Sequence, residues 1–190
     1  VRASGSAWSW HPETKPVTVG VLTLMLSELS TTYTVRKLTE RDVDAIYALS
    51  LGNPLFYRYC PPDVTRESIL EDMRALPPHK TYEDKYYVGF WQQNQLLAVL
   101  DLILQYPDEK TAFIGLFMVD QSVQGRGVGT GMISELCDAL HRLGYETVRL
   151  GYAKGNQQSL SFWLKNQFIP TGEERQNAGY TVVMLQRSLG

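Results

Sequence analysis

A glycine-rich turn between an apolar segment and an amphipathic helix constrains the fold of this chain more than any other feature. The turn follows the apolar residues 112–119 and reads Gln124-Gly125-Arg126-Gly127-Val128-Gly129-Thr130-Gly131. Its glycine backbone can approach a ligand closely, and the first amides of the following helix lack an intrahelical acceptor. Such amides, together with the helix dipole, favour an anion. The turn therefore predicts a pyrophosphate-binding junction between a strand and a helix.

Two other phosphate-binding motifs do not fit these residues. A P-loop requires lysine and then serine or threonine after its final glycine, whereas Gly129 is followed by Thr130 and Gly131. A dinucleotide fingerprint requires the spacing GxGxxG, but the pair Gly125 and Gly127 leads to Thr130. The segments before the turn also have the pattern of antiparallel strands. Neither a P-loop nor a Rossmann site is therefore predicted.

The order of predicted elements is mixed. A strand over residues 33–38 precedes a helix that Thr39 or Glu40 opens, an irregular aromatic segment over 55–60 and a helix over 65–76. Antiparallel strands follow over 86–91, 96–105 and 112–119, and then an amphipathic helix over 127–143. A strand around Val148 and Leu150, a helix bearing Leu160 to Phe168, and a last strand over 180–185 complete the pattern. We expect an α/β fold of the α+β type in a domain over residues 32–190, with residues 1–31 as an N-terminal extension.

Composition and charge bound the class of protein. The 190 residues are 44% hydrophobic, which suits one domain with one core. The 18 basic and 20 acidic residues form no cationic cluster of the kind that a nucleic-acid backbone requires. The apolar residues 17–26 are too few to span a bilayer, and Pro12 and Glu13 precede them in place of a basic segment. We expect a cytoplasmic protein without a nucleic-acid partner or a membrane.

The cysteines and histidines point to no metal centre. Cys60 and Cys137 form no CxxC pair, and His11, His79 and His141 have no metal-ligand spacing. The sequence therefore predicts two reduced thiols, no disulfide framework and no metal.

Two motifs resemble the GNAT superfamily of acyl-CoA-dependent N-acetyltransferases. Gln124, Gly127 and Gly129 match its signature Gln/Arg-x-x-Gly-x-Gly/Ala at a strand-to-helix junction. Asn156, Ser159, Trp163, Gln167 and Phe168 then align with Asn-x-x-Ala-x-x-x-Tyr-x-x-x-Gly-Phe. The resemblance covers residues 33–189 by element order. It implies the GNAT fold, whose mostly antiparallel sheet is splayed between the fourth and fifth strands, and a homodimer paired through the last strands.

The resemblance also implies acetyl-CoA as co-substrate, an amine acceptor and direct attack in a ternary complex. The turn would hold the pyrophosphate, and the preceding strand would hold the pantetheine through main-chain atoms. A backbone amide near Met118 would polarise the thioester carbonyl. The implied cofactor-binding residues are Phe117, Met118, Val119, Gln124, Gly125, Arg126, Gly127, Val128, Gly129, Thr130, Asn156, Ser159 and Trp163.

Two departures from the family pattern concern proton transfer. Trp163 stands where relatives have the tyrosine that protonates the departing thiolate, and an indole N–H is too weakly acidic for that role. Tyr152, water or departure of the unprotonated thiolate are the alternatives. Gly115 stands where many relatives have the carboxylate that deprotonates the amine. Asp101, which interrupts the apolar residues 96–104, is the candidate replacement; a structural hydrogen bond is the alternative role for its carboxylate.

The residues leave two classes of function open. One is an N-acetyltransferase that positions both substrates without the usual acid and base, since proximity supplies a large part of the rate. The other is a non-catalytic acyl-CoA-binding regulatory module, for which Gly115 and Trp163 argue. Acceptor sites are built from variable loops, so neither the acceptor amine nor the acyl-chain length follows from the sequence.

Overall fold

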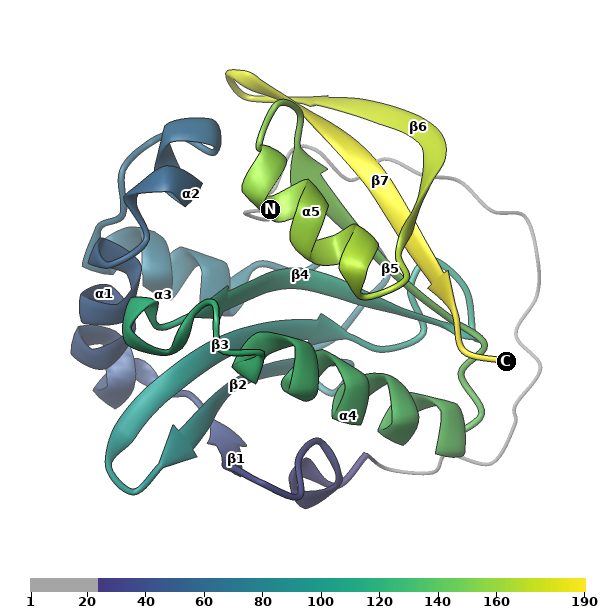
Figure 1. Cartoon of the computed structure of the whole chain (residues 1–190), viewed down its shortest axis with the longest axis horizontal. Coiled ribbons are helices and arrows are strands. Elements are labelled where there is room, and N and C mark those ends of the chain that lie inside the picture. Colours follow the sequence, from purple (N-terminus) through teal and green to yellow (C-terminus); the bar gives the residue numbers. More distant parts are fainter. Residues whose placement is uncertain (1–23) are drawn as a thin grey trace.

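The computed structural model describes residues 24–190, which form one seven-stranded sheet with helices on both faces (Figure 1). The strand order is β1-β2-β3-β4-β5-β7-β6. The strands are β1 (Thr34–Lys37), β2 (Lys85–Gln92), β3 (Gln95–Ile103), β4 (Thr111–Val119), β5 (Thr147–Ala153), β6 (Ile169–Asn177) and β7 (Tyr180–Ser188). The helices are α1 (Val43–Leu51), α2 (Pro54–Tyr59), α3 (Arg66–Arg74), α4 (Val128–Arg142) and α5 (Gln157–Lys165), with 3-10 turns η1 (Leu26–Glu28), η2 (Glu40–Asp42) and η3 (Gln121–Val123).

Alternation along the central strands divides the core between the two faces of the sheet. Leu100 and Leu102 of β3 pack in the larger cluster with the apolar stripe of α4, whereas Val99 packs in a second cluster with α1 and α3. In Figure 1, α4 and α5 lie in front of the sheet and α1, α2 and α3 gather at its left. β4, the strand that precedes the glycine-rich turn, is therefore held between two packed layers, since Ile114 lies in the larger cluster and Met118 in the second.

The sheet opens between β4 and β5. These strands pair in parallel only from Thr111 with Thr147 to Ile114 with Leu150, after which β5 continues in its ladder with β7. A bulge lies at the same level of β4, because Asp101 of β3 pairs with Leu116 and Leu102 pairs with Ile114, which leaves Gly115 as the inserted residue. The mixed sheet and its splay confirm the predicted fold class.

Two elements differ from the sequence prediction. Residues 55–60, expected to be irregular, lie mostly in α2, which Pro54 opens with its φ already fixed near the helical value. β6 was not predicted, because Pro170, Gly172 and the polar residues around them show no apolar alternation. β6 forms as the outer strand of a hairpin with β7, and partner pairing rather than burial defines it.

The residues before β1 pack on the domain. Leu24 and Leu29 are buried in the larger core cluster, and the Glu135 carboxylate accepts hydrogen bonds from Ser30 Oγ at 2.5 Å and the Thr31 amide at 3.1 Å. Residues 24–31, which the sequence prediction placed in the extension, are thus part of the packed unit. Residues 1–23, with His11 and most of the apolar residues 17–26, lie outside the described residues.

Gln167, which stands at the glycine of the family motif, occupies the left-handed region with φ 67° two residues after the end of α5. We expect Gln167→Gly to raise the free energy of unfolding by about 1 kcal/mol, because glycine adopts this conformation without a Cβ clash. Thermal unfolding should show a melting temperature about 2–4 °C higher. Gln157→Gly, in the first turn of α5, is the control and should lower it; a lower melting temperature for Gln167→Gly would contradict the expectation.

Candidate active site

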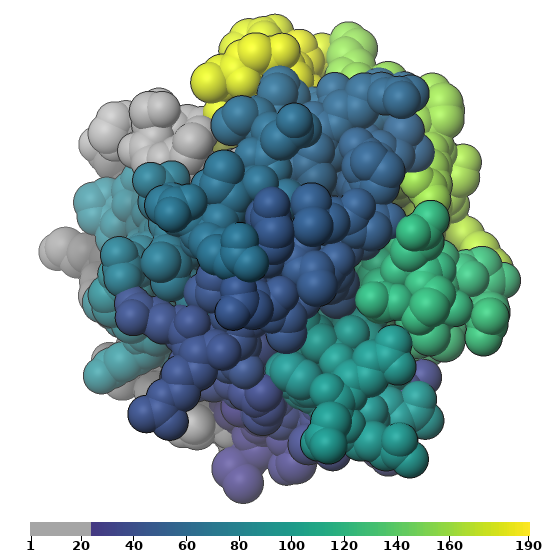
Figure 2. Space-filling model, turned by 90° about the vertical axis from the view of Figure 1, so that its left-hand side faces the viewer, coloured from purple at the N-terminus to yellow at the C-terminus, as the bar shows by residue number. Residues whose placement is uncertain are grey.

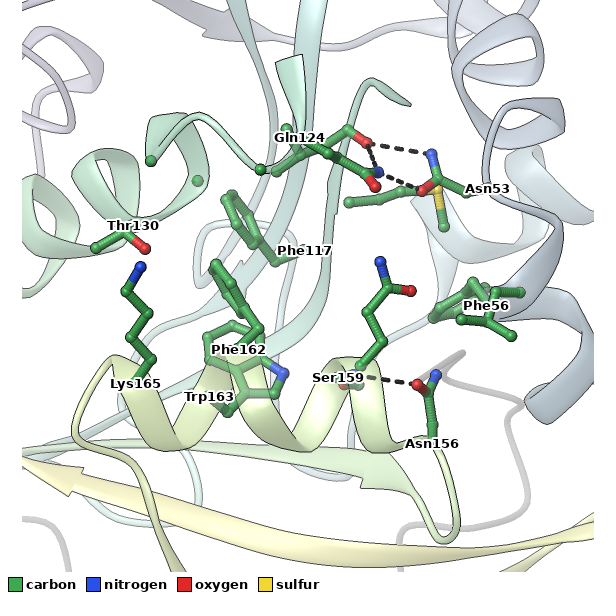
Figure 3. A pocket seen from close by; sticks show the side chains of 17 residues that line it. Asn53, Phe56, Phe117, Gln124, Thr130, Asn156, Ser159, Phe162, Trp163 and Lys165 are labelled. Atoms are coloured by element: carbon green, nitrogen blue, oxygen red, sulfur yellow. Dashed lines mark hydrogen bonds between the residues drawn. The ribbon is translucent and has the colours of Figure 1, made fainter. Parts of the chain in front are cut away.

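A cavity of about 290 Å³ lies where the end of β4, the glycine-rich turn and α5 meet (Figure 3). Its lining includes the predicted cofactor-binding residues except Arg126 and Val128. Arg126 is exposed, and Val128 packs against the larger core cluster. The elements far apart in the sequence thus bring most of the predicted residues to one cavity.

The turn presents unpaired helix amides to this cavity. Gly125 and Gly127 have φ of 72° and 81°, and a Cβ atom on either would meet nothing within 4 Å. The first α4 hydrogen bond runs from the Gly131 amide to the Gly127 carbonyl at 2.9 Å. The amides of residues 128–130 therefore have no i−4 acceptor in the helix and are available to an anion.

Gly129 has a different reason to be glycine. A Cβ atom there would lie 3.2 Å from Val119 Cγ2 and 3.3 Å from the Phe162 ring. The absence of a side chain lets α4 approach both β4 and α5 closely, so this glycine serves packing rather than an unusual φ.

The register of β3 and β4 shows which main-chain groups face the splay. The Asp120 amide donates to the Leu97 carbonyl at 2.8 Å, and hydrogen-bonded and non-hydrogen-bonded pairs alternate along an antiparallel ladder. The pairs of Val119 with Ala98 and of Phe117 with Leu100 are therefore of the non-hydrogen-bonded kind. The peptide groups of Phe117 and Val119 point toward β5, and those of Met118 point toward β3.

The splay leaves a strand edge that an extended ligand can bind. Ladder pairing with β5 ends at Ile114, so among the described strands none pairs with β4 on that side at Phe117 and Val119. The Val119 carbonyl already accepts from Gln124 Nε2 at 2.8 Å and from Asn53 Nδ2 at 3.2 Å. The N–H and C=O of Phe117 and the N–H of Val119 are the groups that remain for a ligand with amides along its length.

Helix α5 forms the opposite wall. The Asn156 side chain accepts from the Ser159 amide at 3.0 Å, which caps the helix. Phe162 stacks on Phe117 with ring centroids 6.0 Å apart. Trp163 is buried and packs edge-to-face against Phe162, with ring centroids 4.9 Å apart. Trp163, which stands at the position of the family's tyrosine, thus packs in an aromatic cluster.

Lys165 is a site residue that the sequence analysis did not single out. Its ammonium group extends toward Thr130 at the start of α4 (Figure 3), and within residues 24–190 no ion pair of Lys165 is found. Gln158, Phe162 and Lys165 all line the cavity at the spacing i, i+4 and i+7. This helical periodicity was the signal that could have identified them.

Asp101 forms a buried ion pair beside the bulge. Lys85 Nζ donates to the two carboxylate oxygens of Asp101 at 2.7 and 2.8 Å. The Lys85 side chain is 3% exposed and the Asp101 side chain is 7% exposed. A Cβ atom on Gly115 would lie 2.8 Å from Asp101 Oδ2, so the carboxylate fills the space next to the missing side chain. Burial raises the pKa of Asp101 above its ordinary value, although the charge of Lys85 and its hydrogen bonds oppose that rise.

A second cavity joins the bulge to β5. Gly115, Leu116 and Trp163 line it together with Cys60 and the half-buried Tyr152. Asp101 borders Gly115 without lining this cavity. Met118 of β4 thus lines the first cavity, Tyr152 lines the second, and the Asp101 carboxylate lies next to Gly115 without lining either one.

Residues 24–190 contain neither a cluster of metal-ligating side chains nor a helix that could span a membrane. No group of three or more His, Cys, Asp or Glu in this part of the chain could hold a metal ion. No helix there is long and apolar enough to cross a bilayer.

The splayed mixed sheet and the amide-lined cavity define a protein with the architecture of acyl-CoA-dependent acyltransferases. Residues 51–168 match the family model described as the acetyltransferase (GNAT) family. The chain therefore belongs to this family, which confirms the resemblance seen in the sequence. No curated protein matches the chain.

Solved structures show the same fold at low sequence identity. An acetyltransferase from Thermus thermophilus is 18% identical, with a TM-score of 0.65 over 82% of this chain and 96% of that chain. The PaiA N-acetyltransferase from Thermoplasma acidophilum, solved in complex with coenzyme A, is 16% identical, with a TM-score of 0.59 over 82% and 98%. The ribosomal-protein-S18-alanine N-acetyltransferase from Escherichia coli is 15% identical, with a TM-score of 0.60 over 83% and 94%.

Proposed function

We propose that this protein transfers the acetyl group of acetyl-CoA to a primary amine by direct attack in a ternary complex. The observation that carries the proposal is the open edge of β4, which runs from the bulge at Gly115 into the unpaired amides of residues 128–130. An edge followed by an anion site suits a ligand with amides at one end and a pyrophosphate at the other.

The residues of the cavity fit acetyl-CoA with its pyrophosphate at the glycine-rich turn and its pantetheine along β4. The amides of residues 128–130 hold the pyrophosphate, and the main-chain groups of Phe117 and Val119 hold the pantetheine. Asn156, which caps α5, and Ser159 of α5 lie on the other side of the cavity. Acetyl-CoA supplies an acyl carbon with a thiolate leaving group, and this direction places the acyl group at the bulge.

In this proposal the thioester carbonyl contacts the amide of Phe117 rather than that of Met118. The Met118 peptide points toward β3, whereas the Phe117 N–H points into the splay near the bulge. We assign the polarising amide to Phe117, because a fixed N–H aimed at the developing oxyanion stabilises it most.

Attack forms a bond between the amine nitrogen and the acyl carbon, and the carbon–sulfur bond then breaks with release of the CoA thiolate. Asp101 receives the amine proton through water, since its carboxylate lies next to Gly115 and burial raises its pKa. Tyr152 donates a proton to the thiolate from the other side of the second cavity.

A second candidate function is a non-catalytic acyl-CoA-binding regulatory module. The observation in its favour is that Lys85 occupies both oxygens of Asp101, which leaves this carboxylate less free to accept a proton. Both functions require the same cofactor cavity, so only turnover in the presence of an amine distinguishes them.

Initial-rate kinetics test the direct attack. Varying acetyl-CoA at several amine concentrations should give intersecting double-reciprocal lines, and acetyl-CoA alone should leave the mass of the protein unchanged. Parallel lines with an acetylated protein would contradict direct attack. Cys60, which lines the second cavity, would then be the first residue to examine for the acetyl group.

Lys165→Met is expected to weaken CoA binding about 5- to 10-fold at low salt, because a cation facing the start of α4 attracts the phosphates. Titration calorimetry with CoA measures the loss of affinity. The same titration with dephospho-CoA, which lacks the 3′-phosphate, shows whether Lys165 contacts that phosphate or the pyrophosphate. Lys110→Met is the matched control, since Lys110 pairs with Gly144 and Glu146 at the far end of α4. Equal affinities for wild type and Lys165→Met would remove Lys165 from the site.

A further inference from the structure

Two amide side chains connect the acceptor-side helices to the cofactor cavity. Gln124 Nε2 donates to Asn53 Oδ1 and to the Val119 carbonyl, both at 2.8 Å. Asn53 Nδ2 donates to the same Val119 carbonyl at 3.2 Å and to the Leu49 carbonyl at 3.0 Å. The two side chains point toward each other at the rim of the cavity (Figure 3). Asn53 and Gln124, with these four hydrogen bonds, are called the amide clasp below.

The amide clasp joins three elements. Asn53 stands between the end of α1 and the start of α2, and α2 carries Phe56 into the cavity lining. Val119 is the last residue of β4, and Gln124 immediately precedes the glycine-rich turn. Figure 2 shows the blue residues of α1 and α2 lying beside the green residues that lead into α4. The clasp therefore fixes the helices on one side of the cavity to the strand and the turn on the other.

The direction of the Gln124 side chain gives it a role other than ligand contact. Its amide group is committed to Asn53 and Val119. Gly125 and Gly127 follow Gln124, and because glycine has no Cβ atom, no side chain restricts the backbone dihedral angles there. The position of the anion-binding amides relative to β4 then depends on how Gln124 is held.

We propose that Asn53 and Gln124 are positioning residues that set the glycine-rich turn against the end of β4 and thereby tune the affinity for CoA. This inference rests on the proposed function, since it takes the cavity to be the CoA site. Removal of either side chain breaks the Gln124–Asn53 hydrogen bond and leaves the other amide with only its main-chain acceptors, so we expect the two residues to act as one unit whose effects are not additive.

A double-mutant cycle tests this unit, with CoA as the probe in titration calorimetry. Asn53→Ala and Gln124→Ala are each expected to weaken CoA binding about 10-fold, and the double variant also about 10-fold rather than 100-fold. Losses that multiply to about 100-fold, or single variants that bind like wild type, would overturn the inference. If the folded wild type binds no CoA, the proposed function fails instead, which is a distinct outcome.

Thr65→Ala controls for loss of stability on the same side of the molecule. Thr65 accepts from the Ser68 amide at 3.0 Å as the N-cap of α3, and it does not line the cavity. Its removal is expected to lower the melting temperature without changing the dissociation constant for CoA. A loss of affinity in Thr65→Ala equal to that in Asn53→Ala would show that general destabilisation, and not the clasp, controls CoA binding.

Discussion

Gly127→Glu is expected to weaken acetyl-CoA binding more than about 100-fold, because it places a carboxylate at the anion site. Steric overlap often contributes to the effect of such a substitution, but a Cβ atom at Gly127 meets nothing within 4 Å, so that contribution is small. A full charge about 5 Å from a phosphate in a partly screened site costs about 3 kcal/mol, which corresponds to the expected loss. Titration calorimetry with acetyl-CoA and with desulfo-CoA measures the dissociation constants.

Gly127→Asn separates charge from backbone strain in that experiment. Asparagine tolerates the left-handed conformation that Gly127 adopts at φ 81° better than most residues, and it carries no charge. It should therefore retain acetyl-CoA affinity within about tenfold. If Gly127→Glu, correctly folded, binds acetyl-CoA as tightly as Gly127→Asn does, the pyrophosphate does not lie on this turn.

The double substitution of Lys85→Gln with Asp101→Asn is expected to reduce turnover about 100-fold with little change in acetyl-CoA binding. It replaces the buried ion pair by two neutral amides that can still form a hydrogen bond, so neither partner is left as an unpaired charge. Loss of a general base costs about 10² or more in rate. Amine-dependent release of CoA thiol measures turnover, and calorimetry measures binding.

The single variants show why both residues must change together. Lys85→Met alone leaves the buried Asp101 carboxylate without a partner, and breaking such a pair costs about 3–5 kcal/mol of stability. A loss of activity in that variant would therefore say little about catalysis. Unchanged turnover in the folded double variant would show that Asp101 has a structural role and that water accepts the amine proton.

The local features of the fold and of the candidate site could be predicted from the sequence. The glycine-rich turn, the α4 stripe and the motif from Asn156 to Phe168 are contiguous patterns, and each reports a local backbone requirement. The mixed fold followed from the order of such segments. The cavity then gathers the predicted cofactor-binding residues apart from Arg126, which is exposed, and Val128, which packs against the larger core cluster.

The features that the sequence did not reveal depend on contacts between distant residues. Lys85 and Asp101 are 16 residues apart and meet across β2 and β3, and Asn53 and Gln124 are 71 apart. The direction of the Phe117 peptide follows from the pairing register, which one sequence does not determine. β6 exists because β7 pairs with it, and its own residues carry no strand pattern.

Acetyl transfer by this protein is measured directly as amine-dependent release of CoA thiol from acetyl-CoA. The wild type and Gly127→Glu are each incubated with acetyl-CoA and a pooled library of primary amines, and the acetylated product is identified by mass spectrometry. We predict thiol release with at least one amine by the wild type, and its loss in Gly127→Glu. A folded wild type that binds acetyl-CoA but releases thiol no faster with any amine than with buffer alone would contradict acetyl transfer and favour the regulatory module.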